Sequence, residues 1–113
     1  MAFTKVLLSG STSGKQIKVV QTATAGTLIH TAHATSIDEI WIEAVNSSAA
    51  AVLLTIEWGG VASPDDLIQI SIPSQSGYTT VVNGLPLTGG LVVRAFAASA
   101  NVILINGYVN RIS

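Results

Sequence analysis

Apolar and polar residues alternate in short runs along this chain, which is the pattern of a half-buried β-strand. In residues 40–45 the alternation places Ile40, Ile42 and Ala44 on one face of a strand. The opposite face carries Trp41, Glu43 and Val45. Two later runs alternate in the same way, with Leu54, Ile56, Trp58, Ile68, Ile70 and Ile72 facing one side, opposite Thr55, Glu57, Gln69 and Ser71. We expect these isoleucines and Trp58 to lie in the core.

Clusters of Gly, Ser, Asn and Pro separate such runs at intervals of about 10–12 residues, and no segment has a helical period over a useful length. The predicted strands span residues 3–9, 16–22, 26–32, 37–45, 51–58, 67–73, 78–82, 91–97 and 101–109. Short strands at this spacing are typical of a sandwich or barrel. The sequence therefore predicts an all-β fold. We expect residues 1–113 to form a single β-sandwich domain, jelly-roll-like, with eight or nine short and mostly antiparallel strands.

Charged residues are scarce, and this bears on how the surface is used. They make up 10% of the 113 residues, and the net charge is −1; an average soluble domain has about 25%. The mean hydropathy is +0.58. We expect protein to cover part of the surface, as in a homo-oligomer or a subunit of a larger assembly. The alternative is a surface rich in Ser, Thr and Asn that stays soluble without charge.

Several classes of protein are disfavoured by what the chain lacks. The basic residues are scattered, which argues against a direct nucleic-acid partner; they are Lys5, Lys15, Lys18, Arg94 and Arg111. No run of about 18 residues is continuously apolar, so we expect no membrane span. The run after Lys5 is too short for a secretory signal. Cysteine is absent, which excludes disulfides, thiolate metal sites and cysteine nucleophiles.

The segment Gly10–Lys15, "GSTSGK", raises the possibility of a phosphate-binding loop. Such a loop reads G-x-x-x-x-G-K-[ST] and leads from a strand into a helix. Here only three residues separate Gly10 from Gly14, Gln16 replaces the metal-binding hydroxyl, and residues 16–22 have a strand pattern. We interpret the segment as a hairpin connection between two strands.

Two other motifs could carry chemistry. His30 and His33 form an H-x-x-H, but residues three apart on a strand point to opposite faces, and no zinc-ligand spacing is present. One histidine from each subunit at a trimer axis is a variant of the same idea. Glu43 and Glu57 are predicted on adjacent hairpin strands, where they would form either a glycosidase-type pair or, more commonly, a solvated face.

The remaining candidates favour structure over chemistry. Ser63–Asp66, "SPDD", is a strong turn without the oxygen-rich array of a calcium loop. Any Ser-His-Asp set lacks a G-x-S-x-G nucleophile elbow. Four aromatic residues form either a sugar-stacking platform or, more simply, core and interface anchors; they are Trp41, Trp58, Tyr78 and Tyr108. We expect no catalytic, cofactor-binding or metal-binding residues and no enzymatic activity.

Several segments together resemble small virion structural proteins of tailed bacteriophages, including phages of cyanobacteria. The segments are "TATAGTLIHTA" (22–32), "VLLTIEWGG" (52–60), "SPDDLI" (63–68), "NGLPLTGGLVVRAFA" (83–97) and "NVILINGYVNRI" (101–112). The resemblance implies a capsid decoration, or cement, protein without a cofactor. Such proteins often form homotrimers on the capsid exterior and brace the major capsid protein, after assembly in the host cytoplasm.

Two alternatives stay open beside this expectation. One is a tail or fibre component of the same kind of virion, in contact with host glycans. The other is a carbohydrate-binding β-sandwich module with Trp41 or Trp58 on its surface. An exposed tryptophan would favour the glycan binder, and self-association that resists dilution would favour the cement protein.

Overall fold

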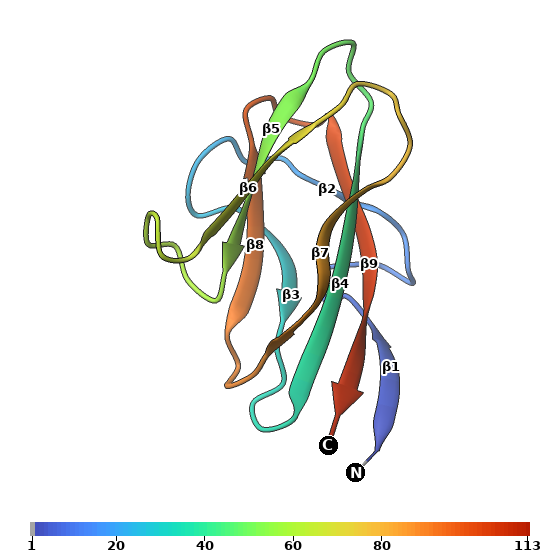
Figure 1. The fold of residues 1–113 in the computed structure, drawn as a ribbon, viewed down its shortest axis with the longest axis vertical. Helices are drawn as coiled ribbons and strands as arrows, with labels where there is room; N and C mark the ends of the chain where they lie inside the picture. The colour runs from blue at the N-terminus through green and yellow to red at the C-terminus, as the bar shows by residue number, and fades with distance from the viewer. Residues whose placement is uncertain (1) are drawn as a thin grey trace.

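The computed structural model describes residues 2–113, which form nine strands in two antiparallel sheets and, within that range, no helix (Figure 1). The strands are β1 (Phe3–Leu7), β2 (Ile17–Lys18), β3 (Thr27–Thr31), β4 (Ile37–Asn46), β5 (Val52–Trp58), β6 (Leu67–Ile72), β7 (Thr79–Leu87), β8 (Val92–Ala97) and β9 (Ile103–Ile112). The predicted all-β fold is confirmed. This part of the chain has no helix long and apolar enough to cross a membrane.

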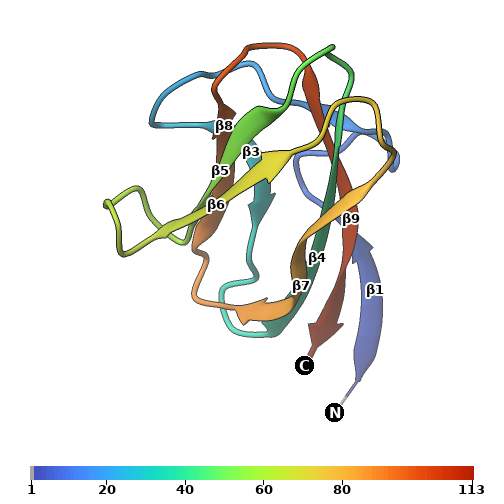
Figure 2. The same cartoon turned by 45° about the horizontal axis from the view of Figure 1, so that its top comes forward.

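The strand order is that of a jelly roll. Sheet A has the order β1-β9-β4-β7, with β2 also paired to β9, and sheet B has the order β3-β8-β5-β6. The paired strands are therefore nested along the chain: β5 pairs with β6, β4 with β7, β3 with β8, and β1 and β2 with β9. A long antiparallel ribbon rolled in this way gives the two facing sheets of a jelly roll, as Figure 2 shows from a second direction.

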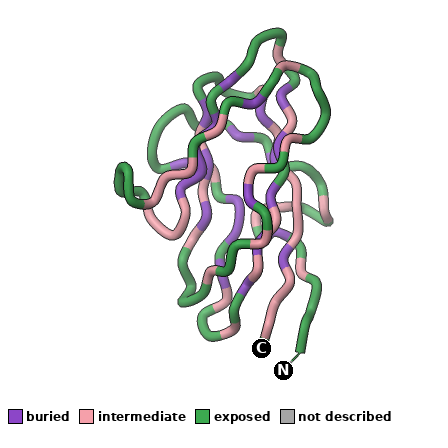
Figure 3. The backbone as a smooth tube through the Cα atoms, in the orientation of Figure 1, coloured by how far each residue is buried: buried purple, intermediate pink, exposed green. Residues whose placement is uncertain are grey.

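The core lies between the two sheets, where the alternating residues meet (Figure 3). The predicted inward residues Ile40, Ile42, Ala44, Leu54, Ile56 and Ile72 are all fully buried. Ile68, Ile70 and Trp58 are only partly buried and pack against the core from its margin. Strand β6 is an edge strand with a neighbour on one side, so its side chains have less cover than those of β5.

The first two strands differ from the prediction. Strand β2 is only two residues long, and β1 and β2 do not pair with each other. Both run along the same side of β9, so residues 8–16 are an excursion within one interrupted edge strand and not a hairpin. This excursion reaches the other sheet, where the Gly10 amide donates to the Ile29 carbonyl over 2.9 Å. It thereby closes one side of the sandwich.

The molecule is elongated, and both described ends of the chain lie together at one tip (Figures 1 and 2). Its extents are 45 × 28 × 21 Å. The Ala2 amide donates to the Ser113 carbonyl, and the Ser113 amide to the Ala2 carbonyl, over 3.0 Å each. The accessible surface is 5720 Å², close to the roughly 5,800 Å² expected for a compact chain of this mass.

Candidate functional site

The outer face of sheet A carries a regular set of aromatic and polar side chains. Strand β4 contributes the sequence "EIWIE" and β9 the sequence "NGYVN", in which every second residue points outward. The antiparallel register places Glu39 beside Asn110, Trp41 beside Tyr108, and Glu43 beside Asn106. We call these six residues, together with Tyr78, the aromatic face. Two carboxylate–amide pairs thus flank a pair of aromatic rings.

The two rings are nearly parallel. Their centroids lie 5.9 Å apart and their planes differ by 10°. The indole of Trp41 lies against the backbone of Gly84 on β7, where a Cβ atom would come within 2.8 Å of Cζ2. Gly84 also has a φ of +75°, which L side chains rarely adopt. Glycine at this position therefore lets the indole rest on the neighbouring strand. The Lys5 ammonium lies 4.9 Å from the centre of the Tyr108 ring.

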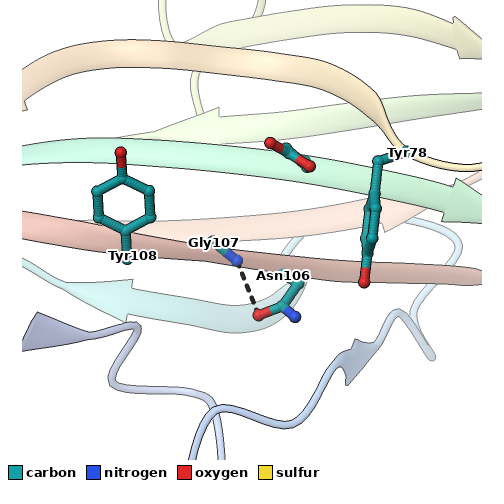
Figure 4. A pocket seen from close by; sticks show the side chains of 5 residues that line it. Tyr78, Asn106, Gly107 and Tyr108 are labelled. Carbon is teal, nitrogen blue, oxygen red and sulfur yellow. Dashed lines mark hydrogen bonds between the residues drawn. The ribbon is translucent and has the colours of Figure 1, made fainter.

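Tyr78 forms the wall of a shallow cavity on this face. The cavity, of about 250 Å³, is lined by Glu43, Tyr78, Asn106, Gly107 and Tyr108. In Figure 4 the ring of Tyr78 is seen edge-on at one end and that of Tyr108 face-on at the other, with Asn106 between them. The Tyr78 hydroxyl donates to Oε1 of Gln16 over 3.1 Å. This bond ties the ring of Tyr78, a residue that is 54% exposed, across the sheet.

The polar groups of the aromatic face are only partly used within the chain. Oε1 of Glu39 accepts from Nε1 of Trp41 over 3.2 Å and from Nδ2 of Asn110 over 3.3 Å. Oδ1 of Asn106 accepts from the Gly107 amide over 2.9 Å. Within residues 2–113, the carboxylate of Glu43 and Nδ2 of Asn106 make no hydrogen bond to protein. Those two groups are therefore available to a ligand.

The four predicted aromatic candidates divide between the sheets. Trp41, Tyr78 and Tyr108 gather on sheet A, whereas Trp58 ends β5 in sheet B and packs at the margin of the core. Two adjacent cavities of about 250 Å³ each share Tyr108, and one of them also has Trp41 in its lining. Three of the four aromatic residues therefore belong to one continuous surface.

A second exposed surface lies at the tip that holds both described ends of the chain. Its residues are apolar, and we call them the terminal apolar surface: Phe3, Ile37, Pro86, Leu87, Leu91 and Ile112. The register places Ile112 between Phe3 and Ile37. A cavity of about 320 Å³ then joins Ile37 to Pro86, Leu87 and Leu91. The six side chains are therefore contiguous.

The histidine motif is part of a buried polar cluster. His30 is fully buried, and its Nε2 lies 2.8 Å from Oδ2 of Asp38. The Ser9 amide donates to Nδ1 of His30 over 3.0 Å, so Nδ1 carries no proton and Nε2 donates to Asp38. The ring of His33 is not part of this cluster. Its Nδ1 accepts from the amides of Thr35 and Ser36. In the part of the chain that the structure describes, no three His, Asp or Glu side chains are placed to hold a metal.

Arg111 completes this cluster, which the sequence reasoning did not find. Its Nε donates to Oδ1 of Asp38 over 2.7 Å and its Nη2 to Oδ2 over 3.0 Å. Burial of the carboxyl raises the pKa of Asp38, but hydrogen bonds from Arg111 and His30 and the Arg111 charge outweigh it and lower the pKa to about 2. The same hydrogen bond to Asp38 raises the pKa of Arg111. The cluster joins β3, β4 and β9 and is structural.

Ser9, His30 and Asp38 lie together, yet they are not arranged as a catalytic triad. His30 accepts from the backbone amide of Ser9 and not from its hydroxyl. The Ser9 hydroxyl oxygen instead accepts from the Thr31 amide over 2.7 Å. A triad requires the imidazole to take the proton of the nucleophilic hydroxyl. This geometry gives Ser9 no general base.

The predicted pairing of Glu43 and Glu57 is wrong. Strands β4 and β5 belong to opposite sheets, because the connection between them crosses the sandwich instead of forming a hairpin. Glu57 is 1% exposed on the outer side of sheet B, where the segment between β2 and β3 covers it. Its Oε1 accepts from the Gly26 amide over 2.6 Å, and its Oε2 accepts from the Thr24 hydroxyl. The two carboxylates cannot act as a glycosidase pair.

The two glycine- and proline-containing segments are both turns. In Gly10–Lys15, the Ser11 amide donates to the Leu8 carbonyl and the Lys15 amide to the Thr12 carbonyl. Strand β2 follows, not a helix, as the sequence predicts. In Ser63–Asp66, Oδ2 of Asp66 accepts from the Ala62 amide over 3.1 Å. Neither segment contributes to the aromatic face.

Comparison of the chain with protein-family models, with curated proteins and with solved structures finds no match.

Proposed function

We propose that this chain is a non-enzymatic structural protein of a tailed-phage virion, a decoration protein that binds its own copies and the major capsid protein. The observation that carries the proposal is the terminal apolar surface. Phe3 is 73% exposed there, Leu91 46% and Ile37 43%. A contiguous apolar patch on a small domain is characteristic of an interaction site.

The edge of sheet A extends the same surface. Strand β1 pairs only with β9, so its other edge has unpaired backbone groups within the described residues. Its side chains include Phe3 and the 51%-exposed Leu7. Free edges of this kind pair readily with another chain. Lys5 is the one charged residue of β1.

The energetics favour assembly by repetition. A standard interface buries about 800 Å² on each partner, roughly one seventh of the 5720 Å² surface of this molecule. Binding costs several kcal/mol in lost freedom of motion, so one modest patch gives modest affinity. Copies joined to one another and to a shell bind by avidity. A homotrimer on the capsid exterior, as the sequence resemblance implies, meets this requirement.

The first experiment measures the mass of the purified protein by multi-angle light scattering over a wide range of dilution. We expect the wild-type protein to be an oligomer. We expect the Leu91→Ser variant to dissociate into monomers at protein concentrations at least tenfold higher than those at which the wild type dissociates. Leu53→Ser is the matched control, because Leu53 is 45% exposed on the outer side of sheet B. A wild-type chain that stays monomeric at millimolar concentration would refute self-association.

A second experiment tests whether the protein binds the capsid shell or the tail of the particle. Wild-type protein and the Leu91→Ser variant are sedimented with capsid shells assembled from the major capsid protein of the same virus. Binding that depends on Leu91 supports the decoration role. Binding to purified tails and not to shells would make the chain a tail or fibre component instead.

A further inference from the structure

We infer that the aromatic face of sheet A is a binding site for a neutral oligosaccharide, which adjoins the terminal apolar surface at Glu39 and Asn110. A hexose ring in its chair form has an apolar face of C–H groups and a rim of hydroxyls. It is therefore recognised by an aromatic face together with side chains that donate and accept hydrogen bonds at the edge of the ring. The aromatic face supplies both kinds of group within one cavity.

The stacking surface is Tyr78. The residue is 54% exposed, and its ring forms a wall of the cavity (Figure 4). The hydrogen bond from its hydroxyl to Gln16 holds the ring in place before any ligand arrives. A preformed wall reduces the entropy lost on binding. Tyr108, at the other end of the cavity, adds a second ring whose plane is nearly parallel to that of Trp41.

The hydrogen-bonding groups have the complementary chemistry. The carboxylate of Glu43 can accept from two hydroxyls, and Nδ2 of Asn106 can donate to a third. These two groups lie opposite each other across β4 and β9, and within residues 2–113 neither has a protein partner. A carboxylate and an amide side by side match adjacent hydroxyls, of which one donates and the other accepts.

The repeat of the pattern indicates an oligosaccharide. Glu39 with Asn110 forms a second carboxylate–amide pair, on the other side of the Trp41–Tyr108 pair. Four residues along a strand separate the two pairs, a distance of roughly 13 Å. That length exceeds a single hexose ring, so the face can contact more than one sugar unit.

The charge of the face selects against acidic ligands. It contains two carboxylates, Glu39 and Glu43, and the Lys5 ammonium lies over the ring of Tyr108. A phosphate or a uronate would be repelled by the carboxylates, because like charges at short range destabilise a complex. We therefore assign the face to neutral hexoses and N-acetylhexosamines.

The test is isothermal titration calorimetry of the full chain with maltohexaose, cellohexaose, chitohexaose and an oligogalacturonate of six units. We expect at least one of the three neutral probes to bind. Tyr78→Ala should weaken that binding about tenfold or more, whereas Tyr78→Phe, which keeps the ring, should stay within about threefold. Glu43→Gln is a second variant on the exposed face and should weaken binding about fivefold.

Gln69→Ala, on the outer side of sheet B, is the control and should leave the affinity unchanged. Circular dichroism checks that each variant is folded. The inference is overturned if no neutral probe binds, if Tyr78→Ala and Glu43→Gln both leave the affinity unchanged, or if the oligogalacturonate binds as tightly as the best neutral probe. Tyr78 and Glu43 do not line the cavities of the terminal apolar surface, so these outcomes are distinct from those that test the structural role.

Discussion

Glu43 and Glu57 occupy similar positions on the outer sides of the two sheets, yet their surroundings are opposite. Glu43, on sheet A, is exposed and has no hydrogen-bond partner within residues 2–113. Glu57, on sheet B, is 1% exposed beneath the segment that joins β2 to β3 and accepts from Thr24 and Gly26. The difference teaches that the alternation of a strand sets the side to which a residue points. Whether that side meets water is decided by segments distant in the sequence.

The largest expected effect comes from removing the buried carboxylate. Glu57→Ala leaves the Gly26 amide without its acceptor and opens a cavity under the covering segment, so the free energy of unfolding should fall by about 3 kcal/mol. Glu43→Ala should change it by less than about 0.5 kcal/mol. Urea denaturation followed by circular dichroism measures both. Equal effects would mean that the cover over Glu57 does not contribute to stability.

A third carboxylate sharpens the comparison, because Asp38 points inward. Its folded pKa of about 2 is below the ordinary 3.8, so the stabilisation is present above pH 3.8 and is lost as the pH falls through about 2. The loss should amount to about 2 kcal/mol. Thermal unfolding from pH 5 to pH 2 measures it, and Asp38→Asn should remove this step. Asp65→Asn, on an exposed turn, should leave the step in place.

A smaller loss of stability is expected for Gln69, which lies on the outer side of sheet B where that side is exposed. Gln69 donates from Nε2 to Oγ1 of Thr55 over 3.2 Å. Gln69→Ala should cost about 1 kcal/mol, the net value of one neutral hydrogen bond. Gln69→Glu replaces the donor with an acceptor and should cost less than Gln69→Ala, because the Thr55 hydroxyl can donate to the new carboxylate. Urea denaturation compares them, and an unchanged midpoint for Gln69→Ala would mean that water replaces the bond fully.

The smallest effect belongs to the exposed side of sheet A. The ammonium of Lys5 lies over the ring of Tyr108, and an exposed cation–π contact contributes about 0.5 kcal/mol. Lys5→Met keeps most of the apolar stem and should lower stability by that amount, whereas Lys5→Arg should retain it. A double-mutant cycle with Tyr108→Leu isolates the interaction. A coupling energy of zero would show that the contact is not formed in solution.

Local patterns were sufficient to predict the class of the fold and most strands. The β-branched alternation of residues 40–45 and 52–58 predicted β4 and β5, and the core positions Ile40, Ile42, Leu54 and Ile56 are confirmed. Strand β7 was predicted too short, because Asn83, Gly84 and Pro86 are typical of turns. They extend the strand because register shifts in its pairing with β4 accommodate them.

The neighbours of each strand could not be predicted in this way. "EIWIE" and "NGYVN" both have a polar–aromatic–polar alternation, which is the signal that could have indicated the aromatic face. More than 60 residues separate them, and only the jelly-roll order brings β4 beside β9. The Asp38–Arg111 pair depends on the same long-range pairing. The wrong prediction for Glu43 and Glu57 arose because consecutive strands were assumed to be paired.

The nested order of the strands has a consequence for how the protein is made. Strand β9 is the last of the nine strands to be synthesised, yet it lies in the interior of sheet A, between β4 and the edge formed by β1 and β2. During translation, β1 and β2 therefore have no partner in their own sheet, while the inner hairpin of β5 and β6 can already form. Closure of the sandwich must wait until the ribosome has added the residues up to Ile112. We expect a ribosome-bound nascent chain that ends before β9 to be protease-sensitive, and the sandwich to fold only after β9 has been synthesised.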